Sequence, residues 1–181
     1  GADCKLWAHG EQRTDMLRRL RAGEAVRSVP MEYLAKDGHT GWAALTLELV
    51  DIDGTPGFIT MTEDISDRVR AEETLRKLSL AVEQSPDAVI ITDTQGSIEY
   101  VNEAFTRITG YSQAEVVGRN PRLLRSGKTP RATYVSLWAD LLAGRAWQGE
   151  FSNLRKDGSE LIEFARISPL RGDDGKTTHY V

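Results

Sequence analysis

The feature that most constrains the fold is the stretch 86–111, which reads PDAVIITDTQGSIEYVNEAFTRITGY. Two short runs in it, 88–93 and 97–102, are rich in the β-branched and aromatic residues that favour strands. The polar residues between the two runs, at 94–97, are typical of a turn. This pattern predicts a β-hairpin.

The hairpin leads directly into a short helix over 103–109. Asn102 stands before that helix, where its side chain can accept backbone N–H bonds as an N-cap. Gly110 follows the helix and is suited to the left-handed conformation in which many helices end. The stretch therefore predicts a hairpin joined to a capped helix with almost no loop.

The residues upstream predict a helix followed by three strands. The helix covers 11–26, ends near Gly23, and has an apolar face made of Met16, Leu17 and Leu20. The strands are predicted at 28–35, 41–50 and 57–61, separated by Asp-Gly and Pro-Gly turns.

This upstream segment returns in the second half of the chain. The turn 36–38, Lys-Asp-Gly, recurs 120 residues later as 156–158 (156 − 36). The segment 22–26, AGEAV, recurs as AGRAW at 143–147, which is 121 residues later (143 − 22). The two offsets differ by one, so one residue is inserted between the two matching segments, and the spacing indicates an internal repeat.

A helix with an apolar stripe is predicted between the two halves. Residues 67–84 contain no Gly or Pro, and the stripe consists of Ala71, Leu75, Leu78 and Val82. This spacing is typical of a coiled coil, but two heptads also fit a helix that packs on its own domain. Both interpretations stay open. Ser85-Pro86 ends the helix.

Strand alternation divides the later strands into two faces. A helix over 129–144 with Tyr134, Leu137, Trp138 and Leu141 on its apolar face precedes strands at 147–154 and 160–169. The inward residues of these strands are predicted to be Trp147, Phe151, Asn153, Leu161, Glu163, Ala165 and Ile167. Apolar residues that face outward, namely Trp42, Ala44, Ile162 and Phe164, predict a partner surface.

Composition excludes several classes of protein. The 181 residues carry a net charge of −4, which argues against nucleic acid or a basic membrane surface as a partner. No apolar run is long enough to cross a bilayer. The single cysteine, Cys4, forms no disulfide framework, and a reducing, cytoplasmic setting fits best. His9, His39 and His179 are predicted to be exposed, and no catalytic or metal-binding constellation is present, so we do not expect an enzyme.

The hairpin stretch resembles the opening of a PAS sensory domain. The matching positions are Asp93, Gly96, Ile98, Tyr100, Asn102, Phe105, Gly110 and Tyr111. The resemblance implies an α+β fold, in which a five-stranded antiparallel sheet is flanked by short helices. It implies a tandem arrangement: the second half of one PAS domain over 1–66, a helical signalling linker over 67–85, and a second PAS domain over 86–181 with a truncated last strand.

The second module is similar to the flavin-holding PAS domains of NifL-type and MmoS-type redox sensors. The stretches GRNPRLLRSG and TPRATYVSLWADLLAGRAWQGEFSNLRKDG carry this similarity. It implies FAD as cofactor, with FMN or no tightly held ligand as the alternatives. The residues implied in cofactor binding are Asn120, Arg122, Trp138, Trp147 and Asn153, and strand alternation adds the inward carboxylate of Glu163.

Position 121 distinguishes this module from the related LOV photoreceptors. Their loop reads GRNCR, whereas Pro121 stands here in place of the thiol. A flavin would therefore signal through its redox state rather than through a light-driven adduct. Haem is disfavoured because haem-holding PAS proteins place their axial histidine in the helix that corresponds to 129–144, and this helix contains none.

The function expected from the resemblance is sensory. The module would convert redox state or ligand occupancy into a rearrangement of the linker helix and of a homodimer formed through that helix and the outer sheet faces. The rearrangement would act on a downstream output domain such as a histidine kinase or a diguanylate cyclase. The alternative is a cofactor-free module for dimerisation and signal relay.

Overall fold

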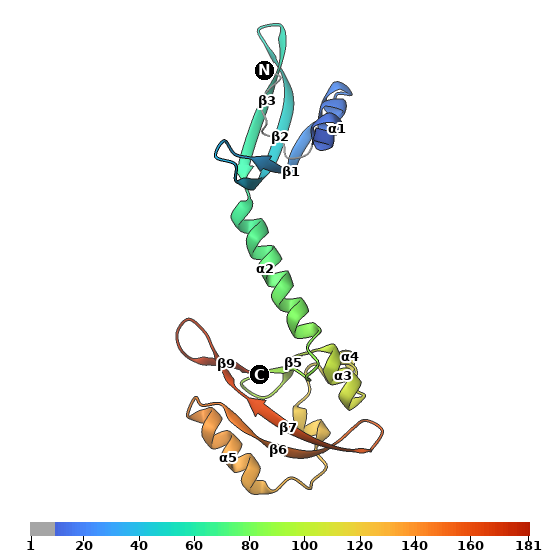
Figure 1. The fold of residues 1–181 in the computed structure, drawn as a ribbon, viewed down its shortest axis with the longest axis vertical. Helices are drawn as coiled ribbons and strands as arrows, with labels where there is room; N and C mark the ends of the chain where they lie inside the picture. The colour runs from blue at the N-terminus through green and yellow to red at the C-terminus, as the bar shows by residue number, and fades with distance from the viewer. Residues whose placement is uncertain (1–9) are drawn as a thin grey trace. The chain divides into compact units, whose positions relative to one another are not determined.

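The computed structural model describes residues 10–181 and divides into two compact units, one that ends at Lys77 and one that comprises Leu78–Val181. We call them unit 1 and unit 2. Cys4 and His9 lie outside the described residues. The elements of unit 1 are α1 (Gly10–Arg21), β1 (Val26–Leu34), β2 (Thr40–Ile52) and β3 (Thr55–Asp64), and α2 (Ser66–Glu83) follows (Figure 1).

Unit 1 is a helix on a three-stranded antiparallel sheet in the order β1-β2-β3. The predicted helix and strands are confirmed. Alternate strand residues and one helix face form its core, which consists of Met16, Leu20, Val26, Met31, Ala43, Leu45 and Leu47.

Two assignments within unit 1 were wrong. Leu17, predicted on the apolar helix face, is 40% exposed, because the buried face runs through Met16 and Leu20 only. Ala44, predicted to face a partner, is buried. Its cross-strand neighbours Pro30 and Glu63 are larger and shield the short side chain. Trp42 is only half-buried.

Unit 2 contains ten further elements, coloured from green to red in Figure 1. They are β4 (Ile90–Asp93), β5 (Ile98–Val101), α3 (Glu103–Thr109), α4 (Gln113–Val116), the 3-10 helix η1 (Pro121–Leu124), α5 (Arg131–Leu142), β6 (Trp147–Leu154), β7 (Glu160–Ile167), β8 (Pro169–Arg171) and β9 (Thr177–Tyr180).

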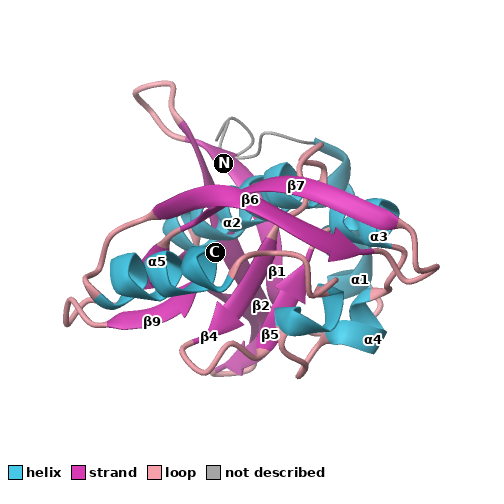
Figure 2. Ribbon diagram, turned by 90° about the horizontal axis from the view of Figure 1, so that it is seen from below, coloured by secondary structure: helices cyan, strands magenta, loops and turns pink. Residues whose placement is uncertain are grey.

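The strands of unit 2 form two antiparallel sheets rather than the single sheet expected. One has the order β5-β4-β9-β8. The other consists of β6 and β7, the two long strands labelled in Figure 2. Only Ser168 separates β7 from β8, and its backbone exchanges two hydrogen bonds with Val181, at 2.7 and 3.0 Å. Pro169 follows and has no N–H to donate to a ladder, which accounts for the break at this point. The last strand, β9, is four residues long and pairs with both β4 and β8.

The predicted hairpin and capped helix are present. The Asn102 side chain accepts from the Phe105 N–H at 3.1 Å, and Gly110 ends α3 with φ 79°. The core of this part consists of Ile98, Val101, Phe105, Val116 and Leu124. Gly96 has φ +78°, a left-handed backbone conformation that favours glycine.

Hydrogen bonds hold both ends of α2. At its start, Ser66 Oγ accepts from the Trp42 N–H at 2.8 Å. At its end, Asn102 Nδ2 donates to the Val82 carbonyl at 3.0 Å, and Tyr100 donates to Glu83. That bond to Glu83 raises the pKa of Tyr100 to about 12.

The β1–β2 hairpin of unit 1 and the β6–β7 hairpin of unit 2 share one pairing register. Tyr33 pairs with Gly41 and Met31 with Ala43, and the residues 120 positions later pair in the same way: Asn153 with Leu161, and Phe151 with Glu163. The extra residue in the first copy lies in a β-bulge between Val26 and Val29, where Ser28 has φ 49°.

Candidate ligand-binding site

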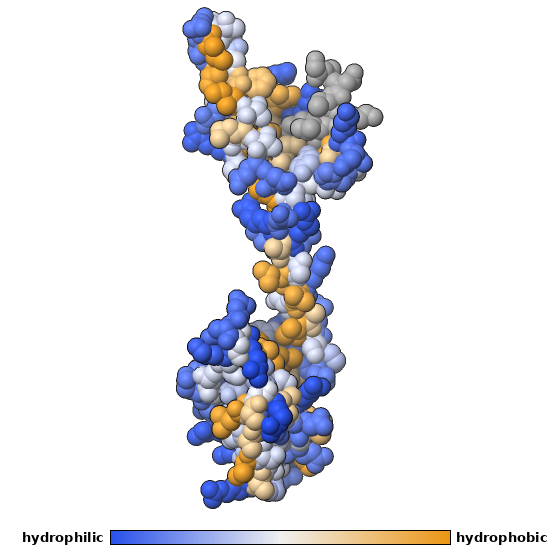
Figure 3. All heavy atoms as spheres, turned by 90° about the vertical axis from the view of Figure 1, so that its left-hand side faces the viewer, coloured by the Kyte–Doolittle hydropathy of each residue, from blue (hydrophilic) through white to orange (hydrophobic). Residues whose placement is uncertain are grey.

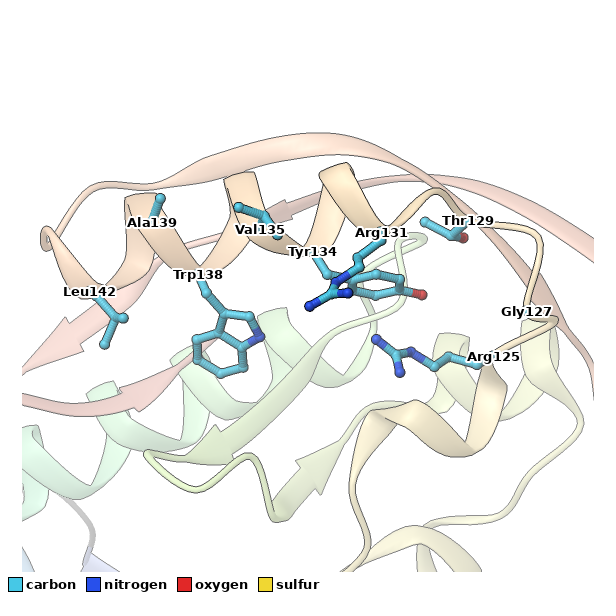
Figure 4. A pocket seen from close by; sticks show the side chains of 9 residues that line it. All are labelled: Arg125, Gly127, Thr129, Arg131, Tyr134, Val135, Trp138, Ala139 and Leu142. Atoms are coloured by element: carbon cyan, nitrogen blue, oxygen red, sulfur yellow. The ribbon is translucent and has the colours of Figure 1, made fainter.

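Unit 2 carries an open groove of about 890 Å³ between α5 and the chain that leads into it (Figure 4). This volume falls within the range of small-molecule sites. The lining residues are Arg125, Gly127, Thr129, Arg131, Tyr134, Val135, Trp138, Ala139 and Leu142. From α5 they recur at positions 131, 134, 135, 138, 139 and 142, the spacing of one helix face.

One wall of the groove is aromatic. The Trp138 ring is edge-on to Tyr180, with 5.9 Å between centroids, and its side chain remains partly in solvent. Tyr134 stacks on Phe151 at 5.7 Å. Trp138 therefore keeps part of its ring open to the groove, whereas the Tyr134 ring stacks on Phe151 and has the Arg125 guanidinium over it, 3.8 Å from its centroid.

The segment before α5 is attached to β6. The backbone of Arg125 bridges to that of Asn153. Thr129 Oγ1 accepts from the Ser152 N–H at 2.9 Å, and Ser126 Oγ donates to the Ser152 carbonyl. These bonds fix the mouth of the groove next to the inner face of the β6–β7 hairpin.

That inner face carries a polar pair in apolar surroundings. Asn153 Nδ2 donates to Glu163 Oε1 at 2.7 Å, and Asn153 is 7% exposed. Burial raises the pKa of Glu163, because an ionised carboxylate loses hydration there, and the bond from Asn153 opposes the shift. Since Asn153 has one more N–H and an acceptor oxygen, the pair can bond the edge of a heterocycle.

The other predicted site residues lie elsewhere. Asn120 Oδ1 accepts from the backbone N–H and the Nε of Arg122, at 3.1 and 3.0 Å, and thereby caps η1. Trp147 is buried and packs on Phe151 with 5.1 Å between centroids. The structure thus joins Asn153 to Glu163 and Asn120 to Arg122, and it places only Trp138 of the six in the groove lining.

Sequence reasoning missed the charged and polar residues of the groove. Arg125, Arg131 and Thr129 line it but were not among the predicted site residues. The helical spacing of Arg131, Tyr134 and Trp138 was a usable signal. Nothing local in the sequence brings Arg125 to the same place, because its position depends on the pairing with β6.

The described residues offer little for other kinds of site. Within 10–181 no group of three His, Cys, Asp or Glu side chains is arranged to hold a metal ion. The two histidines in this range lie beside single carboxylates, His39 beside Asp37 and His179 beside Glu99. No helix of this part of the chain has the length and apolar character needed to cross a membrane.

Comparison with known proteins finds similarity to proteins named as a regulator and a sensor. The nitrogen fixation regulatory protein of Klebsiella oxytoca is 41% identical over 100 residues, which cover 55% of this chain and 20% of that protein. The oxygen sensor protein DosP of Escherichia coli is 29% identical over 161 residues, or 86% of this chain and 20% of that protein. The chain thus spans about a fifth of the length of these relatives.

A solved structure agrees with the fold. The PAS domain of a protein from Colwellia psychrerythraea is 27% identical, with a TM-score of 0.53, and the match covers 59% of this chain and 91% of that one. The family model described as the PAS fold matches residues 76–181, more than half of the chain. The chain therefore belongs to the PAS family.

Proposed function

We propose that unit 2 is a sensory PAS module that binds a flavin and that α2 and a homodimer relay its state to an output domain. The observation that carries the proposal is the Asn153–Glu163 pair on an inner face whose edge adjoins an aromatic groove. A nitrogen fixation regulator and an oxygen sensor among the relatives support a sensory role.

The residues present fit a flavin. Its ring is flat and aromatic, with a heterocyclic edge that both donates and accepts hydrogen bonds. Trp138 offers a ring surface that is partly open to the groove, and Asn153 with Glu163 offers the donor and acceptors. A bound flavin would supply reversible electron transfer. The chain's own residues would hold the ring, keep one side away from water, and change their hydrogen bonds when its protonation changes.

The proposed signal is redox state. FAD is the form that the sequence resemblance favours, with FMN as the alternative. Pro121 lies at the start of η1 and carries no thiol, so this position cannot form a covalent bond with a flavin. Blue light without an electron donor should leave the flavin spectrum unchanged, whereas a reversible bleaching in light would contradict the redox assignment.

The relay is proposed to pass through α2. Its stripe is open to solvent, with Leu75 67% and Leu78 60% exposed, and Figure 3 shows apolar atoms along this helix. Burying each leucine against a second copy contributes roughly 1.5–3 kcal/mol. The exposed Ile162 and Phe164 on the outer face of β7 would add to the same homodimer. In this proposal unit 1 is the second half of another PAS domain.

A cofactor-free relay is the second candidate. Its support is the buried cluster of Trp147, Phe151, Leu137, Leu141 and Tyr180, which already fills the space between α5 and the strands. In such a module the aromatic residues would only pack in the core, and signal relay would depend on the homodimer.

Absorbance of the purified chain tests the flavin proposal. The visible bands of an oxidised flavin should appear, or be restored by adding FAD or FMN, and dithionite should bleach them. Asn153→Ala removes hydrogen bonds worth about 0.5–1.5 kcal/mol each and should weaken retention. Gln148→Ala, on the exposed face of the same strand, is the control. A chain that retains no flavin after reconstitution leaves only the cofactor-free relay.

Light scattering tests the dimer separately. The double variant Leu75→Glu/Leu78→Glu should convert a dimer to a monomer, and Lys77→Glu, off the stripe, should not. A wild-type chain that is monomeric at high concentration, or a double variant that stays dimeric, would show that the stripe is not the interface.

A further inference from the structure

We infer that the short helix α3 is a rigid connector, which couples the β6–β7 hairpin with its Asn153–Glu163 pair to the last turn of α2. The inference rests on the proposed relay through α2 and adds to it the route by which the candidate site reaches that helix.

The end of α3 is bonded to the turn of the β6–β7 hairpin. Arg155 Nε donates to the Ile108 carbonyl at 2.9 Å, and the Lys156 N–H donates to the Thr109 carbonyl at 2.9 Å. The same guanidinium donates through Nη1 to the carbonyl of Glu160, the first residue of β7, at 2.6 Å. One arginine side chain therefore attaches both strand ends of the hairpin to the last turn of α3.

The start of α3 is bonded to α2. The N–H of Glu103, the first residue of α3, donates to Glu83 Oε1 at 3.1 Å, and the Tyr100 hydroxyl donates to the other oxygen of that carboxylate. Asn102 donates from Nδ2 to the Val82 carbonyl at 3.0 Å. These bonds hold the start of α3, and the strand before it, to the last two residues of α2.

The helix between these two attachments can move as one body. Three of its seven residues, Ala104, Phe105 and Thr109, are buried, and Asn102 and Gly110 cap its ends. A short capped helix whose side chains are close-packed has no internal hinge, so a displacement at one end is transmitted to the other.

The candidate site acts on the same strand ends that α3 holds. Asn153 lies two residues before Arg155, and Glu163 lies three residues after Glu160. A ligand that changes the hydrogen bonds of the Asn153–Glu163 pair therefore displaces the part of the hairpin that is attached to α3. Spatial continuity alone does not demonstrate coupling, so the test measures each end of α3 while the other is altered.

Hydrogen exchange of the full chain without ligand tests the connector. Arg155→Gln should speed exchange of the Glu103 amide, at the opposite end of α3, by about threefold or more. Tyr100→Phe removes only the bond of the hydroxyl and keeps the ring, and it should speed exchange of the Lys156 amide in the same way, because coupling between two sites is reciprocal.

Two controls separate coupling from a general loss of stability. The Val181 amide, which donates to the Ser168 carbonyl at 3.0 Å, should exchange at its wild-type rate in both variants. Arg166→Gln, at an exposed position of the same hairpin, should leave the Glu103 amide unchanged. If Arg155→Gln speeds exchange only around the hairpin turn, or equally at the Val181 amide, the inference is wrong.

A second measurement connects the route to the proposed function. Exchange of the Gln84 amide, which donates to the Leu80 carbonyl at the end of α2, is compared in the flavin-loaded chain before and after reduction with dithionite. The wild type should show a difference, and Arg155→Gln and Tyr100→Phe should each remove it without changing the flavin absorbance. A difference that persists in both variants would show that the signal takes another route. A chain that binds no flavin overturns the proposed function, and the ligand-free exchange still decides the connector.

Discussion

Units 1 and 2 contain the same hairpin with different chemistry on its inner face. Both hairpins follow a helix, and their strands pair in one register. In unit 1 the inner positions hold Tyr33 and Ala43, and in unit 2 the equivalent positions hold Asn153 and Glu163. The backbone is shared, and two side chains separate an apolar interior from one that offers hydrogen bonds.

The difference shows that the strand register and the polarity of the inner face are specified by separate residues. Alternation of apolar residues and the Lys-Asp-Gly turn are common to both hairpins, and they set the register. The polar pair contributes nothing to that pattern. The raised pKa of Glu163 shows that burying this carboxylate disfavours its ionised form.

Introducing the Asn–Glu pair at the equivalent positions of unit 1 should have the largest effect on the free energy of unfolding. Ala43→Glu places a carboxylate at a position that is 2% exposed, and an unpaired buried charge lowers the free energy of unfolding by about 3–5 kcal/mol. Adding Tyr33→Asn should recover roughly 1.5–3 kcal/mol through a hydrogen bond to the charge. Urea denaturation measures both.

Ala43→Gln separates the charge from the added bulk, because the two side chains have nearly the same size. If the Glu and Gln variants are equally unstable, crowding rather than charge distinguishes the two inner faces.

The two ends of α2 offer a second contrast. Asn102 makes four side-chain hydrogen bonds, two as acceptor and two as donor, so Asn102→Ala should cost about 1–3 kcal/mol for a buried donor left unpaired. Ser66→Ala loses the bonds to Trp42 and should cost about 0.5–1.5 kcal/mol. Hydrogen exchange is measured at the Phe105 and Trp42 amides, because each loses its side-chain acceptor in one of the two variants. Faster exchange at Trp42 in Ser66→Ala than at Phe105 in Asn102→Ala would reverse the predicted order.

Glu163 in unit 2 should contribute to the pH dependence of stability. A carboxyl group whose pKa is raised on folding stabilises the native state fully below its unfolded value, near 4.5, and this contribution is lost as pH rises through the folded pKa. Glu163→Gln should remove that loss, so the variant should be more stable than the wild type at neutral pH. Thermal unfolding across pH measures this, with the exposed Glu150→Gln as control. A variant that is no more stable than the wild type at neutral pH would show that the hydrogen bond from Asn153 fully offsets the cost of burying the Glu163 carboxylate.

A substitution in the β-bulge of unit 1 should have the smallest effect on stability. Ser28 has φ 49°, and glycine relieves this strain at some cost in chain entropy, so Ser28→Gly should raise stability by up to about 1 kcal/mol. Ser152→Gly in the regular strand β6 should instead lower it by about 0.5–1 kcal/mol. Two variants that change stability in the same direction would show that the bulge carries no strain.

Much of the fold follows from local patterns. The cap at Asn102, the glycine after α3 and the inward faces of β6 and β7 are set by neighbours within a few residues, and the sequence predicts them correctly. The division of the strands into two sheets was not predicted, because it depends on where Ser168 meets Val181.

The candidate site is harder to predict from the sequence than the fold is. Residue types that suit a ligand can be recognised, but their grouping depends on contacts between distant segments. Arg125, for example, reaches the groove through its pairing with Asn153, a contact that local spacing does not show. The exposure of Leu17 likewise depends on where the sheet lies beneath α1.

The bulge in β1 also shows how such a hairpin can change its length. One residue more than in β6 is taken up between Val26 and Val29, and from Val29 onward every partner is kept up to the turn. A bulge at the start of the strand therefore takes up an inserted residue without changing the register beyond it. An insertion nearer the turn, without a bulge, would move the inner side chains of the shifted strand residues to the outer face. The beginning of this strand is where related chains can gain or lose a residue without altering which side chains meet the interior.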